Sequence, residues 1–240
     1  MSINEQAAAT NTETPLELLK TQRSHNLFVL SNANSGQEKT FLSWYRGDCL
    51  NAILGDERVL GVQHYEQHEV DITRGAYKPI PYHYLSIIEL SLDGAEEAEE
   101  LINTIRALHQ DERSTQDPVT WLYYPVSEQV GRPVKNKPSM LTLAFANAVP
   151  GTELEFRAWY ATRHIRHALN VTPLVAGQCF ELTQYQSTGP MGAIYNTIAV
   201  YEQDGTPEDI IESFATIKKG TLAFPSLDVS RFAEWVYRPI

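Results

Sequence analysis

Apolar stretches and helical patterns alternate along most of the chain, and they do so twice in the same order. Each half begins with a strand-like run, at residues 27–33 and 140–148, which ends in a glycine-containing turn. Hydrophobic residues three or four positions apart then predict amphipathic helices over residues 38–54 and 153–169. Acidic residues in the first turn of both helices fit the helix dipole. The two halves are therefore predicted to start with the same strand–helix pair.

The remaining elements complete the same order in both halves, strand–helix–strand–strand–helix–strand, which is that of a ferredoxin-like unit. Such a unit leaves one face of its sheet without helices, and two fused units can bury these faces against each other. We predict an α+β protein of two tandem ferredoxin-like βαββαβ units whose antiparallel sheets pack into one intramolecular α/β barrel. The further strands are predicted at 62–67, 84–92, 120–126, 177–183, 195–202 and 233–240, and the second helices at 96–109 and 207–220.

The halves also match residue by residue when the sequence is shifted by 115 positions. The pair Trp44-Tyr45 then falls on the pair Trp159-Tyr160, inside flanks that need no gap. Chance rarely produces such a match, so we interpret the chain as a tandem duplication. The predicted division is a flexible N-terminal tail at 1–23, a first repeat at 24–126, a polar linker at 127–137 and a second repeat at 138–240.

Composition and charge narrow the classes of function. The 240 residues include 19 basic and 30 acidic side chains, which gives a formal net charge of -11. Nucleic acids and anionic membranes are bound through Lys and Arg, so we expect neither as a partner. No apolar run approaches the roughly 20 residues of a membrane span. The first residues lack the basic and apolar parts of a secretion signal, so we expect a cytoplasmic protein.

The first helix of the second half carries the main candidates for chemistry. On a 3.6-residue period, Tyr160, His164 and His167 share a stripe with Phe156, which must face inward. In the first half Cys49 takes the place of His164, so the fold itself does not require histidine there. Because an imidazole titrates near neutral pH, we predict an acid/base site in the second half and a degenerate site in the first.

This order of elements, with an aromatic pair and then a histidine on the first helix, resembles the dimeric α/β-barrel superfamily and within it the EthD-like group. The likeness lies in PGTELEFRAWYATRHIRHAL at 150–169 and LVAGQCFEL at 174–182. The first half reads FLSWYRGDCLNAIL at 41–54, with cysteine where the histidine is expected. EthD-like proteins are associated with degradation and polyketide pathways, and some are cofactor-free decarboxylases or dehydratases of aromatic substrates.

The resemblance implies a cofactor-free acid/base enzyme, a lyase of decarboxylase or dehydratase type or an isomerase. Its substrate would be small, mostly apolar, and aromatic or polyketide-like, in a catabolic or secondary pathway. We assign His164 as general acid/base and Tyr160 as a hydrogen-bonding partner of a substrate oxygen. No metal site is predicted, since the two cysteines are too few and HYEQHE lacks helical HExxH spacing. The expected substrate-binding residues are His167, Trp159, Arg163, Tyr82 and Tyr84.

Two functions of other classes remain open. Chlorite dismutase-like proteins are tandem ferredoxin-like chains in which a histidine of the second half ligates haem iron, so His164 or His167 could be an axial ligand. The chain could also be a non-catalytic small-molecule-binding barrel of the stress-response kind. Glu181 and Asp228 are candidate partners that orient the histidines. Barrels of this kind often associate, so a homodimer or higher oligomer is possible.

Overall fold

The structure is a computed structural model that describes residues 15–110, 112–114, 118–132, 139–186, 195–216 and 224–240. Its first half contains the predicted helices and strands in the predicted order. These are β2 (His25–Ser31), α1 (Glu38–Trp44), a π-helical turn (Tyr45–Cys49), α2 (Leu50–Leu54), β3 (Val59–Gln67), β4 (Tyr84–Leu90), a 3-10 turn (Ala95–Glu97), α3 (Ala98–His109) and β5 (Val119–Pro125).

The second half repeats this order. The part of its last predicted helix at 217–220 lies outside the described residues. The elements are β7 (Met140–Ala146), α4 (Glu153–Trp159), a second π-helical turn (Tyr160–His164), α5 (Ile165–Ala168), β8 (Leu174–Gln186), β9 (Thr197–Gln203), α6 (Pro207–Thr216), a 3-10 turn (Val229–Arg231) and β10 (Ala233–Pro239).

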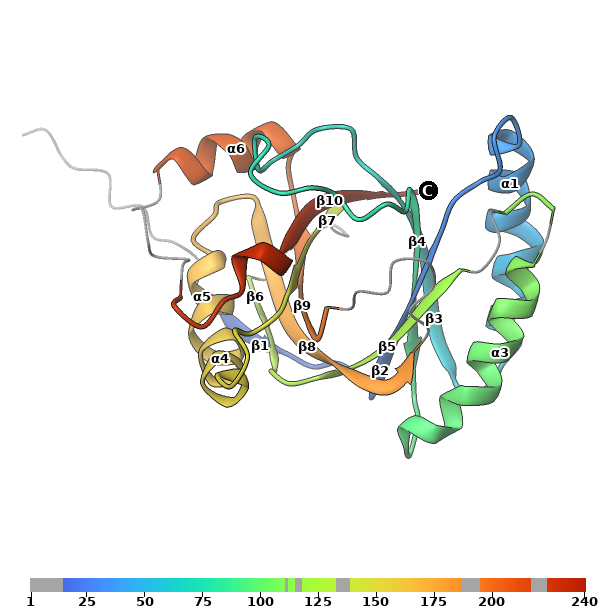
Figure 1. The fold of residues 1–240 in the computed structure, drawn as a ribbon, viewed down its shortest axis with the longest axis horizontal. Coiled ribbons are helices and arrows are strands. Elements are labelled where there is room, and N and C mark those ends of the chain that lie inside the picture. Colours follow the sequence, from blue (N-terminus) through green and yellow to red (C-terminus); the bar gives the residue numbers. More distant parts are fainter. Residues whose placement is uncertain (1–14, 111, 115–117, 133–138, 187–194, 217–223) are drawn as a thin grey trace, which may run out of the picture.

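Eight of these strands form a closed barrel (Figure 1). The order around it is β8-β5-β2-β4-β3-β10-β7-β9, and pairing of β8 with β9 closes the ring. All the pairs are antiparallel. Each half supplies four adjacent strands in the same relative order, and the halves meet at β5–β8 and β3–β10. The predicted fold class, two ferredoxin-like units in one intramolecular α/β barrel, is thereby confirmed.

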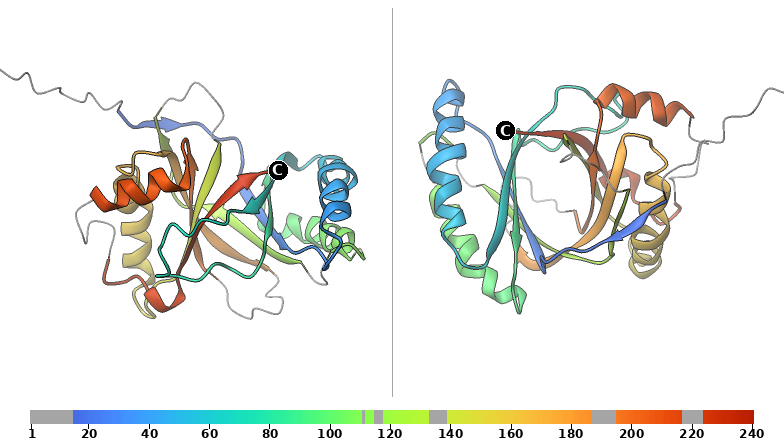
Figure 2. Two further views of the ribbon diagram at one scale, coloured as in Figure 1. Left: turned by 90° about the horizontal axis from the view of Figure 1, so that it is seen from above. Right: turned by 180° about the vertical axis from the view of Figure 1, so that it is seen from behind.

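The helices lie outside the barrel on opposite sides. Figures 1 and 2 show α1, α2 and α3 against the sheet of the first half, and α4, α5 and α6 against that of the second. Side chains consequently form three hydrophobic clusters: one inside the barrel and one between helices and sheet in each half. Equivalent tryptophans, Trp121 of β5 and Trp235 of β10, both belong to the interior cluster. Aromatic side chains thus fill much of the barrel as a packed core.

Both long first helices contain a π-helical turn at the same place. The predicted continuous helices at 38–54 and, to residue 168, at 153–169 are present, but each widens at this turn. The wider turn keeps residues four apart stacked on one another: the ring centroids of Phe156 and Tyr160 lie 4.9 Å apart, and those of Tyr160 and His164 lie 4.7 Å apart. π-Helical turns are frequent at functional sites, so this place on the helix merits close inspection.

Two short strands lie outside the barrel and correct the expected tail and linker. β1 (Glu17–Leu19) pairs with β6 (Gln129–Gly131), which in turn pairs with β8. A Cβ on Gly131 would lie 2.7 Å from the Ala176 Cβ, so only glycine allows this close approach. The described ends of the predicted tail and linker are therefore bound to the barrel, while residues 1–14 and 133–137 lie outside the described residues. Within the described ranges no helix is long and apolar enough to cross a membrane.

Candidate functional site

The predicted site lies in the layer between the first helix and the sheet of the second half. His164, at the end of the π-helical turn, is partly buried. Its ring centroid lies 4.7 Å from those of both Trp159 and Tyr160. Its Nδ1 is buried without a hydrogen-bond partner in the described part of the chain. Burial lowers the pKa of His164 to about 3, and the charge of nearby His167 acts in the same direction. The imidazole is therefore neutral at physiological pH.

Tyr160 is fully buried between His164 and the sheet. Its hydroxyl donates to the backbone oxygen of Ala144 at 3.3 Å, and the Cys179 Sγ lies 3.4 Å from the backbone oxygen of Tyr160. Burial raises the pKa of Tyr160 well above its ordinary value, and the charges of Cys179 and Glu234 add to the effect. The phenol therefore stays protonated and can serve as a hydrogen-bond donor.

Glu234 lies in the candidate site, and the sequence reasoning missed it. It lies on β10 opposite Ala144 of β7, the residue whose carbonyl accepts from Tyr160. Burial raises the pKa of Glu234 to about 7. Its charge in turn raises the pKa values of Tyr160 and Tyr201, and the Tyr201 hydroxyl has no partner among the described residues. A carboxyl group that titrates near neutral pH thus lies beside two buried phenols.

The alternation along β10 could have identified Glu234 from the sequence. Trp235 faces the barrel interior and Val236 belongs to the helix-side cluster. Because side chains alternate along a strand, Glu234 shares the face of Val236. The sequence therefore indicated Glu234 as an acidic residue on a strand face that helices cover.

The other predicted residues of this helix differ in their surroundings. The Trp159 ring is stacked on Phe224 at 4.5 Å between centroids, with 8° between the ring planes. His167 is partly buried, and its Nδ1 has no hydrogen-bond partner within the described ranges. Arg163 is exposed. The helix therefore brings Trp159, Tyr160 and His164 into direct contact, with His167 one turn further along.

The structure does not bring Tyr82 and Tyr84 to His164. Tyr82 belongs to the cluster inside the barrel. Tyr84 lies in the first-half layer, between the helices and the sheet of the first half, with its ring 4.7 Å from that of Phe41. The loop between β3 and β4, teal in Figure 1, extends across to the second half. It contributes Tyr77 instead, whose ring lies 4.6 Å from that of Phe232.

The candidate orienting carboxylates also have other partners. Glu181 accepts a hydrogen bond from the Tyr124 hydroxyl at 2.6 Å and pairs with Arg157 at 3.2 Å. Asp228 accepts from the backbone N–H of Ser230 at 3.1 Å and so caps the 3-10 turn. Neither carboxylate has a histidine among the partners found in the described part of the chain.

A hollow of about 340 Å³ lies beside this layer, at the start of α4. Phe156 separates the hollow from the candidate site, since its ring stacks on that of Tyr160. The hollow combines apolar walls with carboxylate, amide and guanidinium groups, so it suits a small, partly polar molecule. It is lined by Ala148, Pro150, Glu153, Phe156, Glu181, Leu182, Asn196, Thr197 and Arg231.

The first half holds a buried polar network at the equivalent place. The Ser86 Oγ lies 2.6 Å from the Tyr45 hydroxyl and 2.7 Å from the His64 Nδ1. The rings of Tyr45 and His64 stack at 3.9 Å. Burial lowers the pKa of His64 to about 4, with a smaller contribution from the charge of His109. The first-half layer is thus more polar than the single replacement by Cys49 suggested.

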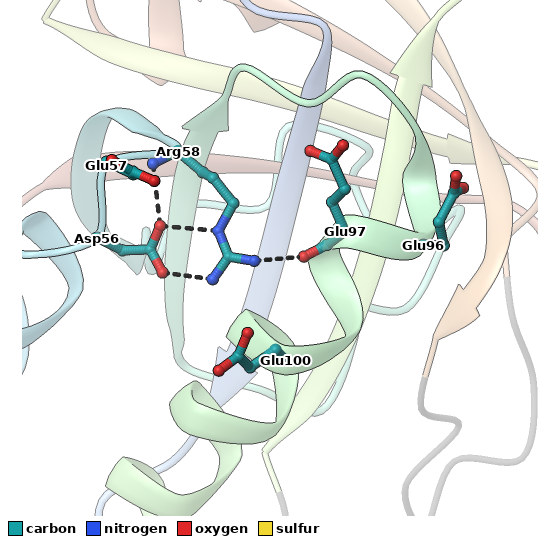
Figure 3. A pocket seen from close by; sticks show the side chains of 6 residues that line it. All are labelled: Asp56, Glu57, Arg58, Glu96, Glu97 and Glu100. Atoms are coloured by element: carbon teal, nitrogen blue, oxygen red, sulfur yellow. Dashed lines mark hydrogen bonds and ion pairs between the residues drawn. The ribbon is translucent and has the colours of Figure 1, made fainter.

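An acidic surface hollow of about 600 Å³ lies on the first half, between the end of the first helix and the start of α3 (Figure 3). Its centre is Arg58, whose guanidinium donates to both Asp56 carboxylate oxygens, at 2.9 and 2.6 Å, and to the Glu97 backbone oxygen at 2.6 Å. These bonds join the end of the first helix to the start of α3. The described residues contain no group of three or more side chains suited to hold a metal ion.

Comparison with known proteins shows the fold. No protein-family model matches the chain, and no curated protein is significantly similar to it. A mutant chlorite dismutase from Candidatus Nitrospira defluvii has a TM-score of 0.54 at 9% identity, with 92% of each chain covered. A provisionally assigned monooxygenase from Fusobacterium nucleatum subsp. nucleatum has a TM-score of 0.52 at 10% identity, covering 90% of this chain and 91% of that one.

A third solved structure, a provisionally assigned chlorite dismutase, has a TM-score of 0.51 at 10% identity and covers 92% of this chain and 96% of its own. The chain shares with all three the fold of a closed antiparallel barrel with helices outside it. At such low identities the likeness does not extend to the reaction.

Proposed function

We propose that the protein is a cofactor-independent acid/base enzyme of the EthD-like kind, with its site in the helix–sheet layer of the second half. The reaction class is that of a lyase, such as a decarboxylase or dehydratase, or of an isomerase. The substrate is a small, mostly apolar aromatic or polyketide-like molecule. The observation that carries this proposal is the Glu234 carboxyl group beside Tyr160, with a pKa raised to about 7 by burial.

The protonation states of Glu234, Tyr160 and His164 determine the role that each has in this proposal. Glu234 exchanges a proton near neutral pH, which is what a general acid or base requires. Tyr160 keeps its proton and, in this proposal, transfers its hydrogen bond from the Ala144 backbone oxygen to a substrate oxygen. His164 is neutral, and its Nδ1 has no hydrogen-bond partner among the described residues, so in this proposal it forms a hydrogen bond with the substrate while Glu234 transfers the proton. The stacked pair of Trp159 and Phe224 supplies a flat apolar wall.

The two halves offer a matched test of the His164 role. The test compounds are flat aromatic and polyketide-like molecules that carry an enol, phenol or carboxyl group. We expect the protein to convert one class of them, in the presence of a chelator and without an added cofactor. His164→Cys installs the residue of the first half and should lower turnover about 100-fold or more. Cys49→Ala should leave turnover unchanged. Equal rates for His164→Cys and the unaltered protein would remove His164 from the mechanism.

Haem binding is the second candidate, because chlorite dismutases share the fold. The described residues do not fit an axial haem ligand. In the described part of the chain, Trp159 and Tyr160 both pack against the His164 ring, so a haem plane could lie beside its ring nitrogen only if both aromatic rings moved. A native mass spectrum of the purified protein tests this alternative: a bound mass equal to haem, with a Soret band, would overturn the cofactor-free proposal.

A non-catalytic binding role would give a different result. The protein would then retain a small molecule tightly without converting it, and His164→Gln would leave its effect in the cell unchanged. The surroundings of Glu234 favour catalysis, because a buried carboxyl that titrates near neutral pH is common at active sites and is costly to keep in a passive barrel.

We further propose that the chain arose by tandem duplication, with repeats at 24–126 and 138–240. The identical strand order of the halves and the π-helical turn at the same place in both support this. The expected surroundings are cytoplasmic, and the expected partners are a small-molecule substrate and further copies of the chain, with no nucleic acid or membrane.

A further inference from the structure

A small cavity lies at one end of the barrel, where β2 begins. Its volume is about 90 Å³. It lies at the seam between the halves, because equivalent positions from both halves line it. Strand register pairs Asn26 with Glu89 and, in the second half, Leu141 with Glu202. The lining residues are Arg23, Asn26, Tyr65, Ile87, Glu89, Gln129, Leu141, Gln178, Phe180, Val200 and Glu202.

The two glutamates of this cavity have different partners. The Glu89 carboxylate pairs with the Arg23 guanidinium at 2.5 Å, and Arg23 also donates to the Gln178 side chain at 2.6 Å. Glu202 instead accepts one hydrogen bond from the neutral Gln129 amide at 2.9 Å. In the described part of the chain, one cation therefore faces two carboxylates. The cavity has a formal charge of one negative when both glutamates are ionised.

An unpaired side-chain oxygen on Asn26 is independent evidence that the cavity takes an occupant. Its side chain lines the cavity and is only 3% exposed, and its Oδ1 has no hydrogen-bond partner among the described residues. The equivalent residue, Leu141, shows that this position of the fold accepts an apolar side chain. A buried acceptor without a donor is costly, so an occupant that donates hydrogen bonds would offset the cost of keeping Asn26.

We propose that the barrel-end cavity binds a small cation with N–H donors, either ammonium or the head of a small primary amine. The Asn26 Oδ1 and the Glu202 carboxylate accept its hydrogen bonds, and Tyr65 lines the same cavity. A cavity of about 90 Å³ limits the occupant to about three water-sized groups. This site is separate from the proposed acid/base site and does not depend on it.

Thermal unfolding of the full chain tests the proposal with four chloride salts at equal concentration: ammonium, methylammonium, potassium and tetramethylammonium. Ammonium or methylammonium should raise the melting temperature by about 2 °C or more above the tetramethylammonium value. Potassium should raise it less, because it donates no hydrogen bonds. Equal melting temperatures in all four salts, or an equal rise with potassium, would overturn the proposal.

Two variants test whether the rise in melting temperature comes from the cavity, and a third controls for the loss of a negative charge. Asn26→Leu copies Leu141 and should fold, yet lose the rise with ammonium. Glu202→Gln should lose it too. Glu66→Gln removes the same charge outside the cavity and should keep the rise. A rise retained in both cavity variants, or lost equally in the control, would contradict the assignment of the site.

Discussion

Equivalent positions in the two halves show what single residues contribute. Tyr45 and Tyr160 occupy the same place on their helices, but Tyr45 bonds to Ser86, whose counterpart in the second half is Ala199. The Tyr160 hydroxyl meets a backbone oxygen instead and has Glu234 nearby. One half thus satisfies its phenol with a buried side-chain network, whereas the other places a titrating carboxyl beside it.

The buried His64 should make stability depend on pH. Its folded pKa of about 4 lies below the ordinary value of 6.5, so the unfolded chain binds a proton first as the pH falls. Its contribution is complete above pH 6.5 and is lost toward pH 4, by up to about 1.4 kcal/mol per pH unit. His64→Cys, which copies Cys179, should reduce the loss of unfolding free energy between pH 6.5 and 5.

Urea unfolding at several pH values measures how the free energy of unfolding changes with pH. His83→Gln serves as a control at an exposed histidine. We expect the His83 variant to keep the slope of the unaltered protein. An unchanged slope in His64→Cys would show that His64 is not held neutral by burial.

At the scale of elements, hydrophobic periodicity predicted the strands and helices of the barrel but not their local departures. A π-helical turn preserves contacts four residues apart, so the apolar pattern of 38–54 gives no sign of it. β1 has only three residues and forms because β6, far along the chain, pairs with it. The crossing of the β3–β4 loop to the second half likewise depends on tertiary packing.

Gly131→Val tests the attachment of β1. The Cβ of the new side chain would stand 2.7 Å from the Ala176 Cβ and 2.9 Å from the Leu19 Cδ1, so the strands must separate. We expect a loss of about 1–3 kcal/mol in unfolding free energy and faster hydrogen exchange at Glu17–Leu19.

Gly47→Ala is the matched control, because a Cβ on Gly47 meets nothing within 4 Å. It should leave hydrogen exchange at β1 unchanged and should not destabilise the protein. Slow exchange at β1 retained in Gly131→Val would contradict the close packing of β1 and β6 on the barrel.

For the whole molecule, the repeat in the sequence was sufficient to predict a closed barrel from two units. It was not sufficient to place every residue of the candidate site. His164 is where periodicity put it, on the inward stripe beside Tyr160, but Tyr82 and Tyr84 pack elsewhere because closing the barrel directs them inward and to the first half. Glu234 joins the candidate site from β10, which is far from α4 in the sequence and is brought there by its pairing with β7.

The titration of Glu234 tests the central claim most directly. Carbon-13 NMR of labelled glutamate carboxyl groups follows each one, and Glu234→Gln identifies the signal by its loss. An acid/base site in the second half predicts a midpoint near pH 7 for Glu234, because burial disfavours its ionised form. A midpoint near the ordinary value of 4.5 would contradict the proposed site.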